Sequence, residues 1–248
     1  MGDSCIDRFI YGTCDRLSPE APVPILNYVE TKEMPGMAAN VVKNLEAFMP
    51  KLSLLTQDNE IVKTRYVDLK SNQHIMRIDN DSDTVSQNTG FSIFETTEIK
   101  RAIGGEFDLV ILSDYDKGFL KKNQMHELTN KLTCLTCVDS KKLDLNCFKK
   151  SILKLNKKEY AMAENTIHKT SDVITTIGSK GAVHNNIIYP AESVEVFDVS
   201  GAGDTFLSAF SVYHAITRKF DESIVFANKC ASIVVQKKGT YAIRNQGW

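Results

Sequence analysis

The sequence predicts an α/β fold built on a mostly parallel sheet, and three observations support this prediction. Four short apolar runs rich in β-branched residues have the length of buried strands and lie at 108–114, 136–140, 151–156 and 172–178. Three segments have the apolar spacing of helices and lie at 37–48, 204–217 and 221–236. Strands that alternate with helices favour a sheet covered by helices.

Each expected helix has one apolar face. The faces consist of Ala38, Val41, Val42, Leu45 and Phe48 in the first helix, Phe206, Phe210, Tyr213 and Thr217 in the second, and Ile224, Ala227, Ala231 and Val234 in the third. The third helix opens on Asp221, a residue type that caps helix N-termini. We therefore expect Asp221 to be the N-cap of that helix.

Two segments of the N-terminal half differ from the rest. Residues 9–33 contain three prolines and no helical period, and residues 62–79 are extended and polar on both sides. Both suit strands that lie outside the main core, such as a small sheet flap. No internal repeat or low-complexity linker divides the chain, so we expect one domain over 1–248 with an appended β lid.

Composition excludes several classes of function. The chain is 42% hydrophobic, and its 30 basic and 31 acidic residues give a formal net charge of −1, so it lacks the basic field that nucleic-acid binding requires. No apolar run approaches the roughly 20 residues that span a bilayer, and the N-terminus lacks a signal-peptide pattern. We expect a cytoplasmic protein that binds small molecules, not nucleic acid or membranes.

The six cysteines are too sparse for the disulfide framework of a small secreted domain, so reduced thiols are expected. Cys134 and Cys137 form a CxxC pattern, which could bind metal or be redox-active, but no second pair follows. We expect these two side chains to pack as small apolar residues at a buried strand edge.

Polar residues follow all four expected strands on the C-terminal side. They are Ser113 and Asp114, Asp139 with Lys141, Asn156, and Thr176 with Gly178. Open α/β sheets bind ligands beyond the carboxyl ends of their strands, so these residues map a candidate site. Strands also end at the surface, where polar residues are common, and the pattern alone does not separate the two interpretations.

The stretch DVSGAGDTF at 198–206 sets Gly201, Ala202 and Gly203 before a helix. Such a turn points several N–H groups at one spot, and the helix dipole adds positive charge there, so an anion is favoured. Asp204 could be an N-terminal cap, or it could accept the proton of an attacking hydroxyl in phosphoryl transfer. The motif alone leaves both roles open.

DVSGAGDTF is similar to the C-terminal signature of the ribokinase-like (PfkB) carbohydrate kinases. NKKE (156–159) resembles the N-x-x-E motif of that family, VDSKK its D-P-K turn, TTIGSKGA (175–182) its nucleotide-flanking turn, and FANKCASIVVQKKGT (226–240) its segment near adenine. The resemblance implies a three-layer α/β/α sandwich with a small β lid. It also implies ATP and Mg²⁺ as cofactors.

The resemblance assigns roles at the nucleotide end. It implies that Asp204 is the catalytic base and that the amides of Gly201, Ala202 and Gly203 form the anion hole. Residues that would contact the nucleotide are Lys141, Asn156, Glu159, Thr176, Gly178, Gly181 and Asn228. Asn156 and Glu159 would hold Mg²⁺ through water.

The N-terminal half looks like kinases that phosphorylate D-glycero-D-manno-heptose 7-phosphate at C1, in GDSCIDRFIYG, RLSPEAPVPIL, PGMAANVVKNLEAF and LSDYDKGFL. This implies that Asp7, Gly36 and Asn40 contact the sugar. Candidates for the 7-phosphate lie on the second lid segment, namely Lys63, Arg65, Asn72, Gln73 and Arg77, although charge on an exposed flap is commonly only solvated. Relatives often pair through lid strands, so a homodimer is expected.

The sequence departs from the family pattern in four places. Only Met1 precedes Gly2 where relatives have an apolar strand, and Gly36-Met37 replaces a Gly-Gly hinge. After 52–60 the chain passes almost directly to KTRYV, and little separates NKKEY from DVITTIG. Two alternatives therefore remain. The chain could be a non-catalytic relative that binds sugar phosphate or nucleotide, or it could be a kinase for another sugar. The joint survival of the catalytic residues favours an active kinase.

Overall fold

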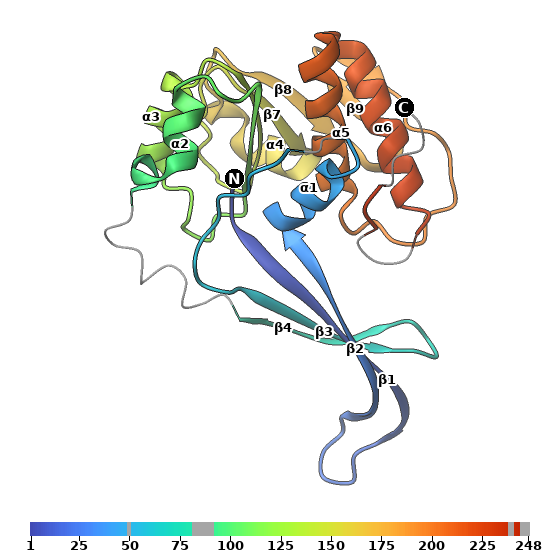
Figure 1. Ribbon diagram of the computed structural model, residues 1–248. Coiled ribbons are helices and arrows are strands. Elements are labelled where there is room, and N and C mark those ends of the chain that lie inside the picture. Colours follow the sequence, from blue (N-terminus) through green and yellow to red (C-terminus); the bar gives the residue numbers. More distant parts are fainter. Residues whose placement is uncertain (49–50, 81–91, 238–240, 244–248) are drawn as a thin grey trace.

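The central sheet has six strands in the order β10-β9-β8-β7-β6-β5 in the computed structural model, which describes residues 1–48, 51–80, 92–237 and 241–243 (Figure 1). Its strands are β5 (Leu109–Asp114), β6 (Leu135–Ser140), β7 (Ile152–Asn156), β8 (Asp172–Thr176), β9 (Ala182–His184) and β10 (Ile187–Tyr189). Strands β5 to β8 are parallel, which confirms the four strands expected from the sequence. The two antiparallel edge strands β9 and β10 were not expected.

Helices cover both faces of this sheet, which confirms the three-layer sandwich. The helices are α1 (Ala38–Leu45), α2 (Thr97–Ile103), α3 (Lys122–Lys131), α4 (Lys157–Ala163), α5 (Ala202–Thr217) and α6 (Phe220–Val234), with short 3₁₀ turns η1 (Ile93–Glu95), η2 (Glu164–Thr166) and η3 (Gly178–Lys180). Successive strand residues point to opposite layers. Thus Ile111 packs with α1, α5 and α6, whereas Leu112 packs with α2 and α3. Burying one large apolar side chain such as Phe210 contributes about 1.5–3 kcal/mol.

Two helix starts differ from the sequence-based expectation. Helix α6 begins at Phe220 with Lys219 as N-cap, so Asp221 lies in the first turn. The carboxylate of Asp221 instead accepts a hydrogen bond from the Tyr189 hydroxyl at 2.6 Å. Helix α5 begins at Ala202, so Asp204 also lies inside its first turn and is not the cap. The Asp204 side chain is therefore available for other contacts.

The lid is a four-stranded sheet that projects from the α/β body (Figure 1). Its strands β1 (Ser4–Leu17), β2 (Pro24–Met37), β3 (Val62–Asp68) and β4 (His74–Asn80) lie in the order β2-β1-β3-β4. This confirms that both segments expected to be extended form strands outside the main core. Because β2 ends at Met37 and α1 begins at Ala38, the lid continues directly into a helix of the body.

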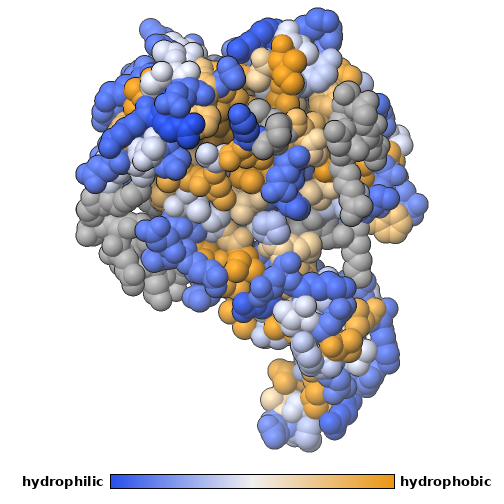
Figure 2. Space-filling view, viewed as in Figure 1, coloured by the Kyte–Doolittle hydropathy of each residue, from blue (hydrophilic) through white to orange (hydrophobic). Residues whose placement is uncertain are grey.

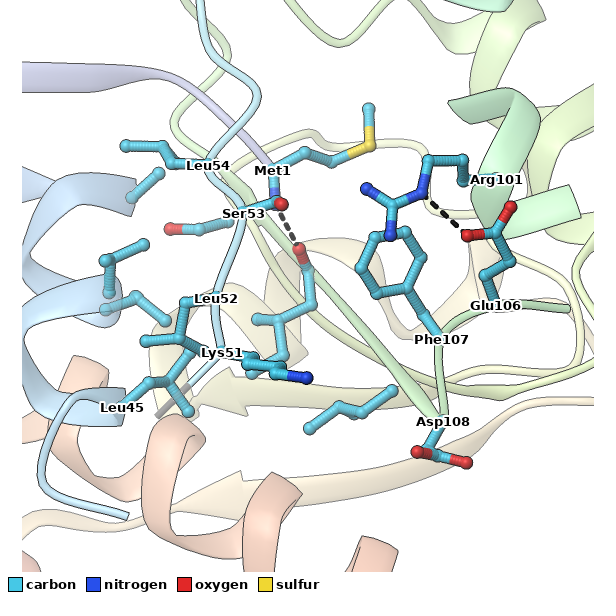
Figure 3. A pocket seen from close by; sticks show the side chains of 16 residues that line it. Met1, Leu45, Lys51, Leu52, Ser53, Leu54, Arg101, Glu106, Phe107 and Asp108 are labelled. Atoms are coloured by element: carbon cyan, nitrogen blue, oxygen red, sulfur yellow. Dashed lines mark hydrogen bonds and ion pairs between the residues drawn. The ribbon is translucent and has the colours of Figure 1, made fainter. Parts of the chain in front are cut away.

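The expected first strand of the central sheet is reduced to a single bridge. Gly2 pairs with Ser113 of β5, where the Ser113 N–H donates to the Met1 carbonyl at 2.9 Å. Beside this bridge lies a cavity of about 600 Å³, shown in Figure 3, with Arg101 and Glu106 paired at its rim. Leu109, Ile111 and Ser113 of β5 contribute to the lining of this cavity.

Two further departures are seen in the connections. Residues 51–61 contain no helix or strand, as the sequence indicates. The second expected loss is only partial, because α4 and η2 fill part of the connection between β7 and β8.

Within the described residues no helix is both long and apolar enough to cross a membrane. Cys137 is buried in the core, whereas Cys134 is partly exposed.

Candidate active site

Asp204 lies at the N-terminal turn of α5, where the body meets the lid. Its side chain is buried, and both carboxylate oxygens accept a hydrogen bond. The Asn40 amide of α1 donates to Oδ2 at 2.6 Å, and the Tyr115 hydroxyl donates to Oδ1 at 3.1 Å. The sequence alone left two roles open for Asp204, helix cap or catalytic base. The structure shows its carboxylate buried and held by two neutral hydrogen-bond donors.

Burial raises the pKa of the Asp204 carboxyl, because the charged form loses its contact with water, whereas the hydrogen bond from Asn40 acts in the opposite direction. The nearby Asp139 carboxylate adds to the rise, and Lys154 and the Tyr115 hydroxyl oppose it. A carboxylate whose proton affinity is increased by burial is a better proton acceptor at neutral pH. Asp204 thus has the environment of a general base.

The turn before Asp204 has the backbone shape that an anion site needs. Gly201 adopts φ 78° as N-cap of α5, a conformation that glycine reaches without steric cost. The Ala202 N–H donates to the Val199 carbonyl at 3.2 Å, so it also closes the turn. The positive end of the α5 dipole adds to the field at this position.

Lys154 is a residue of this site that the sequence interpretation missed. It lies on β7, is buried, and its Nζ donates to Asp139 Oδ2 at 2.5 Å. A Cβ added at Gly203 would lie 2.9 Å from the same Nζ, so the ammonium lies against the turn that is expected to form the anion hole. The signal that could have revealed it is a charged residue inside the buried run SILKLN. We call Asn40, Tyr115, Asp139, Lys154 and Asp204 the catalytic cluster.

Lys141 lies next to this cluster on the nucleotide side. Its Nζ donates to Asp139 Oδ1 at 3.0 Å and to Glu159 Oε1 at 2.5 Å. Burial works against the charged form, but the two carboxylates outweigh it and raise the pKa of Lys141 to about 12. Burial alone would raise the pKa of Asp139, but Lys154 and Lys141 hold it below its usual value. Lys141 is therefore a firmly charged cation beside Asp139 and Glu159.

Asn156 and Glu159 form a capping box at the start of α4. The Asn156 side chain accepts from the N–H groups of Lys158 and Glu159, both at 2.9 Å, and Glu159 Oε2 accepts from the Asn156 N–H at 2.7 Å. The side-chain oxygens of Asn156 and Glu159 are of the type that Mg²⁺ binds. Because these oxygens already accept hydrogen bonds in the capping box, they suit contact with the ion through water. No cluster of three or more His, Cys, Asp or Glu side chains arranged for a metal occurs in the described part of the chain.

The other residues expected at the nucleotide lie at the adjoining strand ends. The Thr176 hydroxyl donates to the Leu155 carbonyl at 3.3 Å, and Gly178 is exposed at the start of η3. Gly181 has φ 96°, and a Cβ there would meet the Tyr189 carbonyl at 2.1 Å. The Asn228 amide donates to that same carbonyl at 2.8 Å, so it fastens α6 to β10. Their roles with nucleotide stay predictions.

The sugar-side residues gather on one face of the lid. Arg65 donates to Asp7 Oδ1 at 2.6 Å, and its guanidinium lies 5.1 Å from the Phe9 ring centre. A Cβ on Gly36 would lie 2.4 Å from Asp7 Oδ2, so a larger residue would displace this carboxylate. Arg77 is paired with Asp79 at 2.6 Å on β4. Asn72 and Gln73 lie in the connection between β3 and β4.

Lys63 differs from the other lid cations. It is buried, and among the described residues it has no ion pair; its Nζ lies 5.7 Å from the Tyr115 ring centre. Burial lowers the pKa of Lys63. A buried ammonium without a carboxylate partner is costly unless an anion arrives, so Lys63 suits an anionic group of a ligand.

The 600 Å³ cavity of Figure 3 is separate from this site. It is lined by Met1, residues 51–54 and 106–109 and the apolar side of α1, and none of its lining residues belongs to the catalytic cluster. The catalytic cluster instead joins α1 and the start of α5 to the region at the carboxyl ends of β5, β6 and β7.

The fold and the cluster define a phosphotransferase that uses a hydroxyl group as acceptor. Residues 51–246 match the pfkB family carbohydrate kinase, and the chain belongs to this family as a sugar kinase. Solved structures with the same fold include ribokinase from Thermotoga maritima (TM-score 0.71, 17% identity, 96% of this chain and 92% of that one) and phosphofructokinase-2 from Escherichia coli (0.74, 14%, 98% and 93%).

Curated relatives include the "Bifunctional protein HldE" of Nitratiruptor sp. and of Campylobacter curvus. Both are 30% identical to this chain, over 96% and 97% of its length respectively. The chain spans 61% of the length of each of these relatives. A ribokinase from Arabidopsis thaliana, solved with ribose and ATP, has a TM-score of 0.71 at 16% identity and covers 98% of this chain and 94% of that one.

Proposed function

We propose that this chain is an ATP-dependent kinase that phosphorylates D-glycero-D-manno-heptose 7-phosphate at C1. The product would be the 1,7-bisphosphate, a precursor of ADP-heptose. The observation that carries this proposal is the buried Asp204 carboxylate at the start of α5, held by Asn40 and Tyr115 close to the lid. The lid and catalytic segments that resemble heptose kinases support the choice of sugar.

In the proposed reaction, Asp204 takes the proton from the C1 hydroxyl as its oxygen attacks the γ-phosphorus of ATP. A bond forms between the sugar oxygen and phosphorus, the bond to the β-γ bridging oxygen breaks, and ADP leaves. The turn at Gly201–Gly203, together with Lys154 beside it, stabilises negative charge on the moving phosphoryl group. Lys141 lies where it can hold the phosphates that remain on the nucleotide.

Mg²⁺ would be held by Asn156 and Glu159 through water and would neutralise phosphate charge. The capping box fixes both side chains before any ion binds, so their orientation does not depend on the metal. ATP is supported by the family and by the ribokinase neighbour whose structure contains it.

The phosphate on the sugar is supported by Lys63. Its ammonium is buried on the lid face that also contains Asp7 and Arg65, and no acidic side chain of the described chain neutralises it within ion-pair distance. Asp7 suits sugar hydroxyls, since a carboxylate accepts their protons in hydrogen bonds. A lid of mixed sign therefore matches a ligand that has both hydroxyls and a phosphate.

The decisive experiment compares turnover of ATP with heptose 7-phosphate and with a panel of unphosphorylated and phosphorylated sugars. The Asp204→Asn variant should lose activity by about a hundredfold or more while still binding nucleotide, because the proton acceptor is gone. Asp144→Asn is a matched control, since Asp144 pairs with Lys122 on the surface near α3.

The outcomes separate the alternatives. Nucleotide binding without turnover of any sugar would favour a non-catalytic relative. Turnover only with ribose or fructose would overturn the heptose assignment and keep the mechanism. Equal activity in Asp204→Asn would refute the assignment of the base.

A further inference from the structure

Tyr115 follows β5 directly, and its hydroxyl is one of the two donors to Asp204. Its backbone is fixed independently, because its N–H donates at 2.8 Å to Oδ2 of Asp3, a fully buried carboxylate. Asp3 also accepts from the N–H groups of Lys117 and Phe119, each at 3.3 Å. The loop that carries Tyr115 is therefore attached at several points, and the phenol is directed at Asp204 by a fixed backbone.

Two cations from different parts of the structure approach the ring of Tyr115. Lys63 Nζ of the lid lies 5.7 Å from the ring centre, and Nζ of Lys141, which follows β6, lies 5.4 Å from it. Cations over an aromatic face are attracted by its quadrupole. The phenol is thus close to a lysine from each of the two predicted phosphate-binding ends, and its hydroxyl contacts Asp204.

We propose that Tyr115 is a positioning residue for the kinase reaction, whose hydroxyl orients the Asp204 carboxylate and keeps it ready to accept the proton of the sugar. The proposal rests on the function proposed above for Asp204. With Asn40 on Oδ2 and Tyr115 on Oδ1, the carboxylate cannot rotate without breaking one of these bonds. Each oxygen retains a further lone pair, so the sugar hydroxyl can bind while Tyr115 stays in place.

The proposal makes a statement about pH. The groups that face Asp204 are Asn40 of α1, Tyr115 after β5, Asp139 of β6, Lys154 of β7 and, on the lid, Cys5. Burial raises the pKa of Asp204, and the hydrogen bond from Tyr115 is one of the contacts that lower it. Loss of the hydroxyl therefore moves this pKa upward. Activity that needs the ionised base would then be lost at a higher pH as the solution is acidified.

The test is Tyr115→Phe, which keeps the ring near the two lysines and removes only the hydroxyl. We expect kcat to fall by about tenfold to a hundredfold, as for loss of a hydrogen bond to a charged group, with little change in KM for ATP. The acidic limb of the kcat/KM profile should move to higher pH. Tyr213→Phe is the matched control, because the Tyr213 hydroxyl, on the same helix as Asp204, donates to Glu222 at 3.3 Å on an exposed surface.

A second measurement works without a substrate. In protein labelled with ¹³C at aspartate carboxyls, the signal missing in Asp204→Asn identifies Asp204, and its titration can be followed in the wild type and in Tyr115→Phe. A titration midpoint of Asp204 that lies at higher pH in Tyr115→Phe than in the wild type supports the proposal, even if no tested sugar is turned over. Titration and pH profiles that superimpose on the wild type would overturn it, whatever happens to the proposed substrate.

Discussion

Met37 occupies a backbone conformation that methionine rarely adopts, with φ 55° and ψ −131°. It is the residue where the family pattern has a second glycine, and the sequence already indicated that methionine fits poorly there. Its side chain is buried against Cys5, Ile61 and Tyr115. Packing therefore holds a strained backbone at the junction of lid and body.

Substitutions at Met37 should reverse the usual order of alanine and glycine. Both Met37→Ala and Met37→Gly lose the buried side chain, but only glycine relieves the strain, which costs about 1–3 kcal/mol. This exceeds the roughly 0.5–1 kcal/mol of extra entropy that glycine loses on folding. We expect Met37→Gly to be the more stable of the two by about 1 kcal/mol in urea unfolding.

The control for this comparison is the ordinary helical position Ala39 in α1. There Ala39→Gly should destabilise the protein by about 1 kcal/mol, since no strain is relieved. Equal stability of the two Met37 variants would contradict the strained conformation.

At the scale of elements, the turn between β3 and β4 is organised by one carboxylate. Asp68 accepts hydrogen bonds from the Cys14 N–H at 3.0 Å, the Ser71 N–H at 2.8 Å and the Ser71 hydroxyl at 2.6 Å. The Ser71 hydroxyl and N–H, followed by the Cys14 N–H, lower the pKa of Asp68 to about 2. Asp68 thus joins β1 to the β3–β4 hairpin of the lid.

The contribution of Asp68 should depend on pH with a defined sign. Its pKa in the folded protein is about 2 and in the unfolded chain about 3.9, so its stabilisation is present above about pH 3.9 and is lost as the pH falls toward 2. Amide hydrogen exchange at Cys14 and Ser71 should accelerate in this window beyond the intrinsic pH effect. In Asp68→Ala these amides should exchange fast already at neutral pH.

Asp15→Asn serves as the matched control, because Asp15 is in the same lid and pairs with Lys70 at the surface. Protection of the Cys14 amide that is the same in the wild type and in Asp68→Ala would contradict the assigned role of Asp68.

At the scale of the whole molecule, the sequence was informative where a local pattern determines the structure. Buried apolar runs predicted β5 to β8. The lid was predicted from prolines without a helical period in one segment and from an extended pattern, polar on both sides, in the other. The strands β9 and β10 have three residues each, too few for a recognisable period. Motif resemblance located Asp204, but the contacts of Tyr115 and Lys154 depend on strands that meet only in space. The charged residue inside the buried run SILKLN marks Lys154 as unusual, but no local pattern reveals which groups Lys154 and Tyr115 contact.

The homodimer expected from the resemblance stays a prediction at this scale. The outer strands β2 and β4 are lid edges, and exposed apolar side chains of the lid include Leu17, Tyr28, Met76 and Ile78. Figure 2 shows hydrophobic patches, in orange, on the projecting lid. Sedimentation equilibrium should give the mass of two 27.8 kDa chains. A Met76→Glu/Ile78→Glu variant should be monomeric, whereas Ile216→Glu, at a 78% exposed position on α5, should not change the mass.

Strand β2 of the lid continues directly into α1, and α1 contacts the predicted base, Asp204. The lid and the base are therefore mechanically connected. Two side chains of this short helix contact α5. The Asn40 amide donates a hydrogen bond to Asp204, and the Asn44 side-chain oxygen accepts one from the Thr205 hydroxyl at 2.9 Å. A swing of β2 would therefore be transmitted through α1 to the carboxylate. We expect a movement of β2 on sugar binding to change the contact between Asn40 and Asp204, so that filling of the lid and alignment of the base are coupled.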